Sequence, residues 1–71
     1  MDIRVGDTVK IICRDMTFSD PAATKVFVGK VISLFNALNR DGSDNWQIEV
    51  RNLHSWFLYK PQIDGGTIEI I

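Results

Sequence analysis

The most reactive side chains in this sequence belong to its single cysteine and its single histidine. Cys13 and His54 are the residue types that serve as nucleophile and general base in thiol-dependent catalysis. Such a pair needs a third group to orient the histidine, and no residue is indicated for that role. Cys13 also shares one face of a predicted strand with Val9 and Ile11, where a free cysteine usually acts as a small hydrophobe. We therefore expect no enzymatic activity and no catalytic residue.

Metal binding is the second chemistry to consider, because the segment 39–45 is rich in aspartate and asparagine. An EF-hand calcium loop requires glycine at its sixth position and glutamate at its twelfth. If the loop started at Asn39, those positions would hold Asp44 and Val50, so the pattern fails. Histidine, cysteine and carboxylate residues are also too widely spaced for zinc. We expect neither a metal nor a cofactor, and we interpret 39–45 as a solvated turn.

Aromatic side chains are concentrated in the segment 56–59, which reads WFLY. In a short strand, Trp56 and Leu58 lie on one face and Phe57 and Tyr59 on the other. A core this small has no room for both faces, so one face is exposed or is covered by a helix or a second chain. Aromatic surfaces bind peptides, although tryptophan and tyrosine also fill small cores. Our candidate binding residues for a protein partner are therefore Trp56, Phe57 and Tyr59.

Basic residues in the first half of the chain form an alternative candidate, a stripe made of Lys10, Arg14, Lys25 and Lys30. If the first two strands pair, Lys10 and Lys30 share the outer face of the sheet. Such a stripe would contact phosphates. Eight basic residues against nine acidic ones give a net charge of −1, which argues against nucleic acid. Outward lysines also simply discourage pairing between sheet edges.

Strands are the elements that must position these side chains. The segment 8–14, TVKIICR, alternates between two faces and is rich in β-branched residues. The segment 45–51, NWQIEVR, alternates cleanly and predicts a strand with one solvated face. Trp46 is followed on its face by Ile48 and Val50, so we expect Trp46 in the core.

The longest apolar segment, 26–38, predicts a long, bent second strand at 28–34 or a little beyond. Gly29 interrupts this segment, and a glycine within a strand often marks a bulge or a bend. The polar residues 39–45 then predict a hairpin turn into the third strand.

Shorter elements complete the chain. A turn at 52–55 precedes the strand 56–59. Residues 60–66 contain Pro61 and two adjacent glycines, which allow one 3₁₀-like turn at most. The final segment, 67–71, reads TIEII and predicts a closing strand.

A short helix is expected at about 20–26. Asp20 is a good N-cap, and Pro21 suits the first helical position because its missing N–H would have no partner there. The residues from Val26 onward include several β-branched types, which favour a strand and end the helix.

A chain of 71 residues builds one domain, 1–71, around one thin core. Five short strands in this length favour an all-β fold, a five-stranded SH3-like small barrel, because closure removes the exposed edges of a flat sheet. The order of a long first loop, two hairpins, a single turn and a final strand matches that architecture.

The expected cellular location follows from segments that the sequence lacks. One cysteine precludes an intramolecular disulfide, and the start MDIRV has no cationic segment followed by an apolar one. No apolar run is long enough to cross a membrane. We therefore expect a cytoplasmic protein with no membrane partner.

Taken over the whole chain, the sequence resembles the YorP family of small proteins from Bacillus and its prophage. The segments that carry the resemblance are VGDTVKIICRD, VFVGKVISLF, NWQIEVRN, SWFLYKPQID and GGTIEII. The resemblance implies five strands with a helix set between two of them, and a phage origin. It implies no activity and no site residues, because the function of that family is unassigned.

A looser resemblance is to KOW-type and other SH3-like modules. The segment GDTVKI at 6–11 is similar to their opening turn and first strand, and GKV at 29–31 is similar to their second strand. The loop at 15–25 departs from the motif, because it is long and lacks the motif's glycines and basic residues.

These observations lead us to expect a prophage-type accessory protein. It would act as a small non-catalytic binding module for a host or phage protein, as a monomer or a weak dimer. A weak nucleic-acid-binding module of the KOW-like kind and a phage structural or assembly component are the alternatives.

Overall fold

One antiparallel sheet of five strands makes up most of the computed structural model, which describes residues 2–15, 17, 19–20 and 22–71. The strand order is β4-β3-β2-β1-β5, so each strand lies beside its neighbour in sequence except that β5 returns to β1. The elements are β1 (Thr8–Arg14), β2 (Thr24–Asn36), β3 (Trp46–Arg51), β4 (Trp56–Tyr59), α1 (Pro61–Asp64) and β5 (Thr67–Ile70). The predicted all-β class is confirmed.

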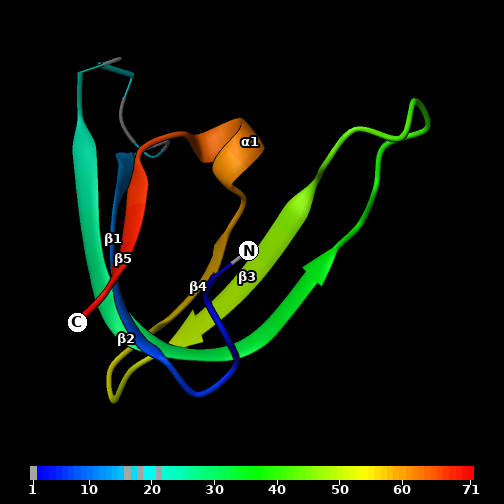
Figure 1. Cartoon of the computed structure of the whole chain (residues 1–71). Coiled ribbons are helices and arrows are strands. Elements are labelled where there is room, and N and C mark those ends of the chain that lie inside the picture. The colour runs from blue at the N-terminus through cyan, green and yellow to red at the C-terminus, as the bar shows by residue number, and fades with distance from the viewer. Residues whose placement is uncertain (1, 16, 18, 21) are drawn as a thin grey trace.

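The sheet is strongly curved because β2 takes part in both of its halves. The first half of β2, from Thr24 to Lys30, pairs with β1, and the second half, from Lys30 to Asn36, pairs with β3. Figure 1 shows β2 running beside β1, bending, and continuing beside β3 into a hairpin that projects from the body. β4 and β5 are the two edges, and no ladder joins them in the described part of the chain. The sheet is therefore open.

The irregularity in β2 lies between Val31 and Ser33, where the register with β3 shifts, and not at Gly29 as the sequence predicted. Gly29 has a different role. A Cβ atom there would lie 2.7 Å from the carbonyl oxygen of Arg51, so the close approach of two backbones requires the glycine.

The helix predicted at 20–26 is wrong in the described residues. β2 already begins at Thr24, and the residues before it form a turn. The N–H of Ala23 donates to the carbonyl of Asp20 at 3.1 Å, and the N–H of Ala22 donates to Oδ1 of Asp20 at 2.9 Å. Residues 24–26 of the predicted helix instead pair with β1 as part of β2. Pro21, the expected first helical residue, lies outside the described residues.

The single turn expected before the last strand is α1. The N–H groups of Asp64 and Gly65 donate to the carbonyls four residues earlier, Lys60 and Pro61, at 2.8 and 3.0 Å. The turn is therefore closed by α-type hydrogen bonds. Pro61 stands at its start, where no N–H is needed. No helix in the described ranges is long and apolar enough to cross a membrane.

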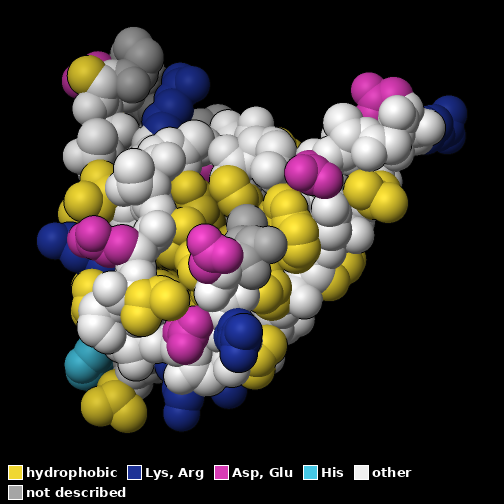
Figure 2. All heavy atoms as spheres, in the orientation of Figure 1, with side chains coloured by type: hydrophobic (Ala, Val, Ile, Leu, Met, Phe, Trp, Pro, Cys, Tyr) yellow, Lys and Arg dark blue, Asp and Glu magenta, His cyan; other side chains and the backbone are white. Residues whose placement is uncertain are grey.

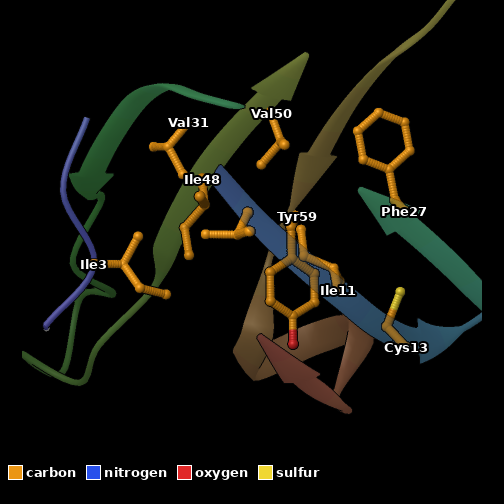
Figure 3. Packing of buried hydrophobic residues seen from close by; sticks show 9 residues of the cluster. Ile3, Ile11, Cys13, Phe27, Val31, Ile48, Val50 and Tyr59 are labelled. Carbon is orange, nitrogen blue, oxygen red and sulfur yellow. The ribbon is translucent and has the colours of Figure 1, made fainter. Parts of the chain in front are cut away.

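The core lies on the concave face of the sheet. Its buried members are Ile3, Val9, Ile11, Cys13, Phe27, Val31, Ile48, Val50 and Tyr59. Figure 3 shows the ring of Tyr59 between Ile48 on one side and Ile11 and Cys13 on the other. In Figure 2 hydrophobic side chains are visible in the hollow between β5 and β3, where the sheet is open. Each strand contributes few residues, so the core is thin.

Trp46 is not part of this core, although its alternation with Ile48 predicted it. It is half-buried at the start of β3, where the β2–β3 hairpin leaves the body. Its backbone N–H donates to Oε1 of Gln62 in α1 at 2.9 Å. The side chain therefore packs at the margin of the concave face.

Candidate functional site

The three candidate aromatic residues of β4 do not share one surface. Tyr59 is 1% exposed and belongs to the core. Phe57 lies on the same face and is half-buried against the core. Trp56 points to the opposite face and is 52% exposed. Only Trp56 and the outer part of Phe57 are therefore available to a partner.

A groove of about 500 Å³ runs along β4, between this strand, α1 and the end of β1. Its aromatic and aliphatic lining comes from β4 and α1, and its charged lining comes from both sides. The lining residues are Arg14, Asp15, Thr17, Lys25, Trp56, Phe57, Leu58, Lys60, Ile63 and Asp64. The lining thus combines apolar surface with three cations and two carboxylates.

The floor of this β4 groove is the ring of Phe57. The ammonium of Lys25 lies 4.0 Å from its ring centroid, a cation–π contact that holds the lysine over the groove. Phe27 packs beside it, with ring centroids 5.6 Å apart. Lys25 lies on the concave face because it pairs with Cys13 in the β1–β2 ladder.

Both carboxylates of the β4 groove already accept hydrogen bonds from the chain. Oδ1 of Asp15 accepts from the hydroxyl and the backbone N–H of Thr17, at 2.6 and 3.0 Å, and these bonds lower the pKa of Asp15. Oδ2 of Asp64 accepts from the backbone N–H of Lys60 at 3.0 Å. The three cations of the lining outnumber these two carboxylates by one, which favours a partner that brings negative charge.

The indole of Trp56 is held in one orientation. Its Nε1–H donates to Oε2 of Glu49 on the neighbouring strand at 2.7 Å. Glu49 lies opposite Leu58, on the same face of the sheet as Trp56. A fixed, half-exposed tryptophan loses little side-chain freedom when a partner packs on it.

The predicted basic stripe is divided between the two faces. Lys10, Arg14 and Lys30 lie on the convex face, but Lys25 lies on the concave face over Phe57, so the four residues do not form one stripe. The sequence reasoning placed Lys25 in a helix, whereas it is the second residue of β2 and alternates with Thr24.

Sequence reasoning missed Arg51. It stands directly opposite Lys30 across the β2–β3 ladder, so two cations face each other on the convex side. Lys10, in contrast, pairs with Glu69 on β5. The turn 39–45 alone would set a register with Lys30 opposite Asn52, and the shift between Val31 and Ser33 is what places Lys30 opposite Arg51.

Cys13 and His54 occupy different surroundings. Cys13 is 2% exposed within the core, and burial raises the pKa of its thiol, which disfavours the reactive thiolate. His54 is exposed in the β3–β4 turn, where its backbone N–H donates to Oδ1 of Asn52 at 2.9 Å. The charge of Lys25 acts to lower the pKa of the Cys13 thiol, but burial outweighs it.

The raised pKa values of Cys13 and Tyr59, both caused mainly by burial, predict a loss of stability in alkali. Both groups are neutral when protonated, so the folded chain holds these protons more tightly than the unfolded chain. Their contribution is present below the ordinary pKa values of 9.0 and 10.0 and is lost as the pH rises through the folded values. We expect the urea midpoint to fall above about pH 9, measured by tryptophan fluorescence. Cys13→Ala should delay the fall, and an unchanged profile would contradict this assignment.

Carboxylate oxygens of the turn at 39–45 accept hydrogen bonds from nearby residues of the chain. Oδ1 of Asp41 accepts from the N–H and the hydroxyl of Ser43, and Oδ1 of Asp44 accepts from the side-chain amide of Asn36 at 2.9 Å. Among the residues that the structure describes, no group of three or more histidine, cysteine or acidic residues is placed to hold a metal ion.

No protein-family model matches this chain, and neither the curated proteins nor the solved structures give a significant match. The β4 groove and the convex face are therefore interpreted from their own chemistry.

Proposed function

We propose that this protein is a small non-catalytic binding module that takes a protein partner in the groove along β4. The observation that carries the proposal is Trp56, a residue that lines the groove and whose half-exposed indole is held by Glu49 on the convex side of β4. Tryptophan and arginine are enriched among the residues that dominate protein interfaces, and Arg14 lines the same groove. The ring of Phe57 offers apolar surface that a partner can bury, and the cations of the groove would orient that partner.

We further propose that the open sheet is a variant of the five-stranded SH3-like barrel. The order β4-β3-β2-β1-β5, a bent β2 shared by both halves and a single turn between β4 and β5 support this assignment. The chain would then differ from a closed barrel in having no ladder between the two edge strands in its described part.

Membership of the YorP family, a prophage origin and a cytoplasmic location are proposals that rest on the sequence alone. The five resembling segments support the first two. The single cysteine, which excludes an intramolecular disulfide, supports the third. An accessory role in which the module recognises a host or phage protein agrees with all three.

Capture of the partner by matched variants tests the proposed function. Immobilised protein is incubated with lysate of a Bacillus host carrying the phage, and bound proteins are identified by mass spectrometry. Trp56→Ala should lose the captured partner while its free energy of unfolding changes by about 1 kcal/mol or less, because the side chain is half-exposed. Leu53→Ala is the control, since Leu53 is a 98% exposed hydrophobic residue outside the β4 groove. Capture of the same partner by wild type and Trp56→Ala would contradict the proposal.

Nucleic-acid binding is the second candidate, and the facing cations Lys30 and Arg51 favour it. A phosphate placed between them would relieve the repulsion of two like charges at opposite positions. Labelled single- and double-stranded oligonucleotides, titrated at low salt, test it. Binding that weakens with salt and is lost in Lys30→Ser and Arg51→Ser would support this candidate, and no shift at high micromolar protein would reject it.

A further inference from the structure

We propose that the partner is an acidic peptide segment in extended conformation, which adds to the sheet as a sixth strand along the free edge of β4. This inference rests on the proposed function and specifies the chemistry of its partner. It follows from the backbone of β4 and from the charges that border the strand.

The turn between β3 and β4 fixes which backbone groups of β4 point outward. The N–H of Asn52 donates to the carbonyl of Ser55 at 3.0 Å, so these two residues form a hydrogen-bonded pair. Hydrogen-bonded pairs alternate with non-bonded ones in an antiparallel ladder. Phe57 and Tyr59 therefore bond to β3, whereas the N–H and carbonyl groups of Trp56 and Leu58 point away from it.

These outward groups lie at the β4 groove, since Trp56 and Leu58 are among its lining residues. The outward groups of Trp56 lie two residues of extended chain, about 7 Å, from those of Leu58. A neighbouring strand presents its own donors and acceptors at the same spacing. β4 is short, with four residues, but its sequence WFLY contains neither a charge nor a proline that would oppose pairing. The edge is thus suited to pairing with an extended segment.

The charges beside the edge select an acidic segment. Arg14, Lys25 and Lys60 border the β4 groove with two carboxylates, Asp15 and Asp64, so the three cations give its described lining a net positive charge. An aspartate or glutamate of the added strand would therefore meet cations.

The other edge strand offers different chemistry. The described residues that line the hollow beside β5 are Asp2, Ile3, Ile68 and Ile70, one acidic and none with a cationic side chain. An acidic segment is therefore expected to bind beside β4 in preference to β5.

A displayed library of random ten-residue peptides, selected against the wild-type protein, provides the probe. Enriched peptides should carry aspartate or glutamate and lack proline at alternate positions, and their binding should perturb the NMR signals of the Trp56 indole and the Leu58 amide. Enrichment of basic peptides would overturn the acidic partner but not the groove, and enrichment of no peptide would count against the proposed groove as well.

Backbone N-methylation of the best peptide then tests strand addition itself. Methyl groups at every second position should weaken binding about tenfold or more, because each removes a donor to β4, and methyl groups at the intervening positions should have little effect. A peptide that perturbs Trp56 but tolerates every methyl group would overturn strand addition and leave the groove as a binding site.

Leu58→Pro gives the matching change in the protein. Proline removes the outward N–H and is tolerated at an edge position whose N–H does not bond within the sheet. Peptide affinity should fall about tenfold or more in Leu58→Pro and stay near wild type in Leu58→Val, which keeps the donor. Equal affinity of both variants would contradict the inference, and the peptide series decides the question if Leu58→Pro does not fold.

Discussion

Replacing Gly66 with alanine is expected to lower the free energy of unfolding by about 3 kcal/mol or more. A small domain of this kind has little stability to lose, so a substantial fraction of the variant should be unfolded at room temperature. The effect is expected although Gly66 is itself exposed.

The cause is the close approach of two backbones where the last strand joins the first. A Cβ atom on Gly66 would overlap the carbonyl oxygen of Ile12 and would lie 2.7 Å from Cα of Cys13. The glycine also has a φ of 76°, in the left-handed region that an L-residue occupies at a cost. The next residue, Thr67, pairs with Ile12, so relief of the overlap would draw β5 away from β1.

The variant Gly65→Ala separates the effect of the positive φ from the effect of the overlap with Ile12. Gly65 has a φ of 68°, and a Cβ there would meet no atom within 4 Å. Its substitution should therefore cost only the backbone strain of φ 68° with ψ −156°, a region almost confined to glycine, about 1–3 kcal/mol. Urea unfolding followed by tryptophan fluorescence measures both variants. Equal losses would show that the overlap with Ile12 is relieved without cost.

Tyr59→Ala is expected to cost about 3–5 kcal/mol, the second large loss. The side chain is 1% exposed at the centre of the core, between residues of β1 and β3. Its hydroxyl also donates to the carbonyl of Gly65, which ties β4 to the segment that leads into β5. Truncation would leave a cavity that a core of nine residues cannot refill.

Tyr59→Phe keeps the ring and removes only the hydroxyl. The loss should be about 1 kcal/mol, because the carbonyl of Gly65 is exposed and can bond to water instead. Thermal unfolding of the three proteins should rank wild type, Tyr59→Phe and Tyr59→Ala in that order. A loss in Tyr59→Phe as large as in Tyr59→Ala would show that the hydroxyl bond, not ring packing, holds this site.

The strands were predictable from sequence because their alternation has a single physical cause. Residues with the period of Val9, Ile11 and Cys13 cover one face of a strand, and this signal also located β3. β4 and β5 were located as short apolar segments beside turns. The prediction of a helix at 20–26 was wrong because it relied on the local N-cap signal of Asp20. The residues that follow pair with β1 instead. The long-range ladder that begins at Thr24 outweighs that local preference.

The candidate site was predictable only as a set of residue types. The sequence showed that Trp56 and Tyr59 lie on opposite faces, but it could not decide which face is buried. That choice depends on the curvature of β2, which brings Phe27 and Phe57 together. Lys25 and Arg51 were misplaced or missed for the same reason, because their positions follow from the strand register and not from their neighbours in sequence.

The pairing of β1 with β5 has a consequence for synthesis of the chain on the ribosome. β1, β2 and β3 can form their meander as soon as they emerge, because each pairs with a neighbour in sequence. The outer side of β1 must wait for Thr67–Ile70, and closing so long a loop is entropically costly. A nascent chain therefore displays an unpaired β1 edge until its last strand is made, and in that interval it is most exposed to aggregation.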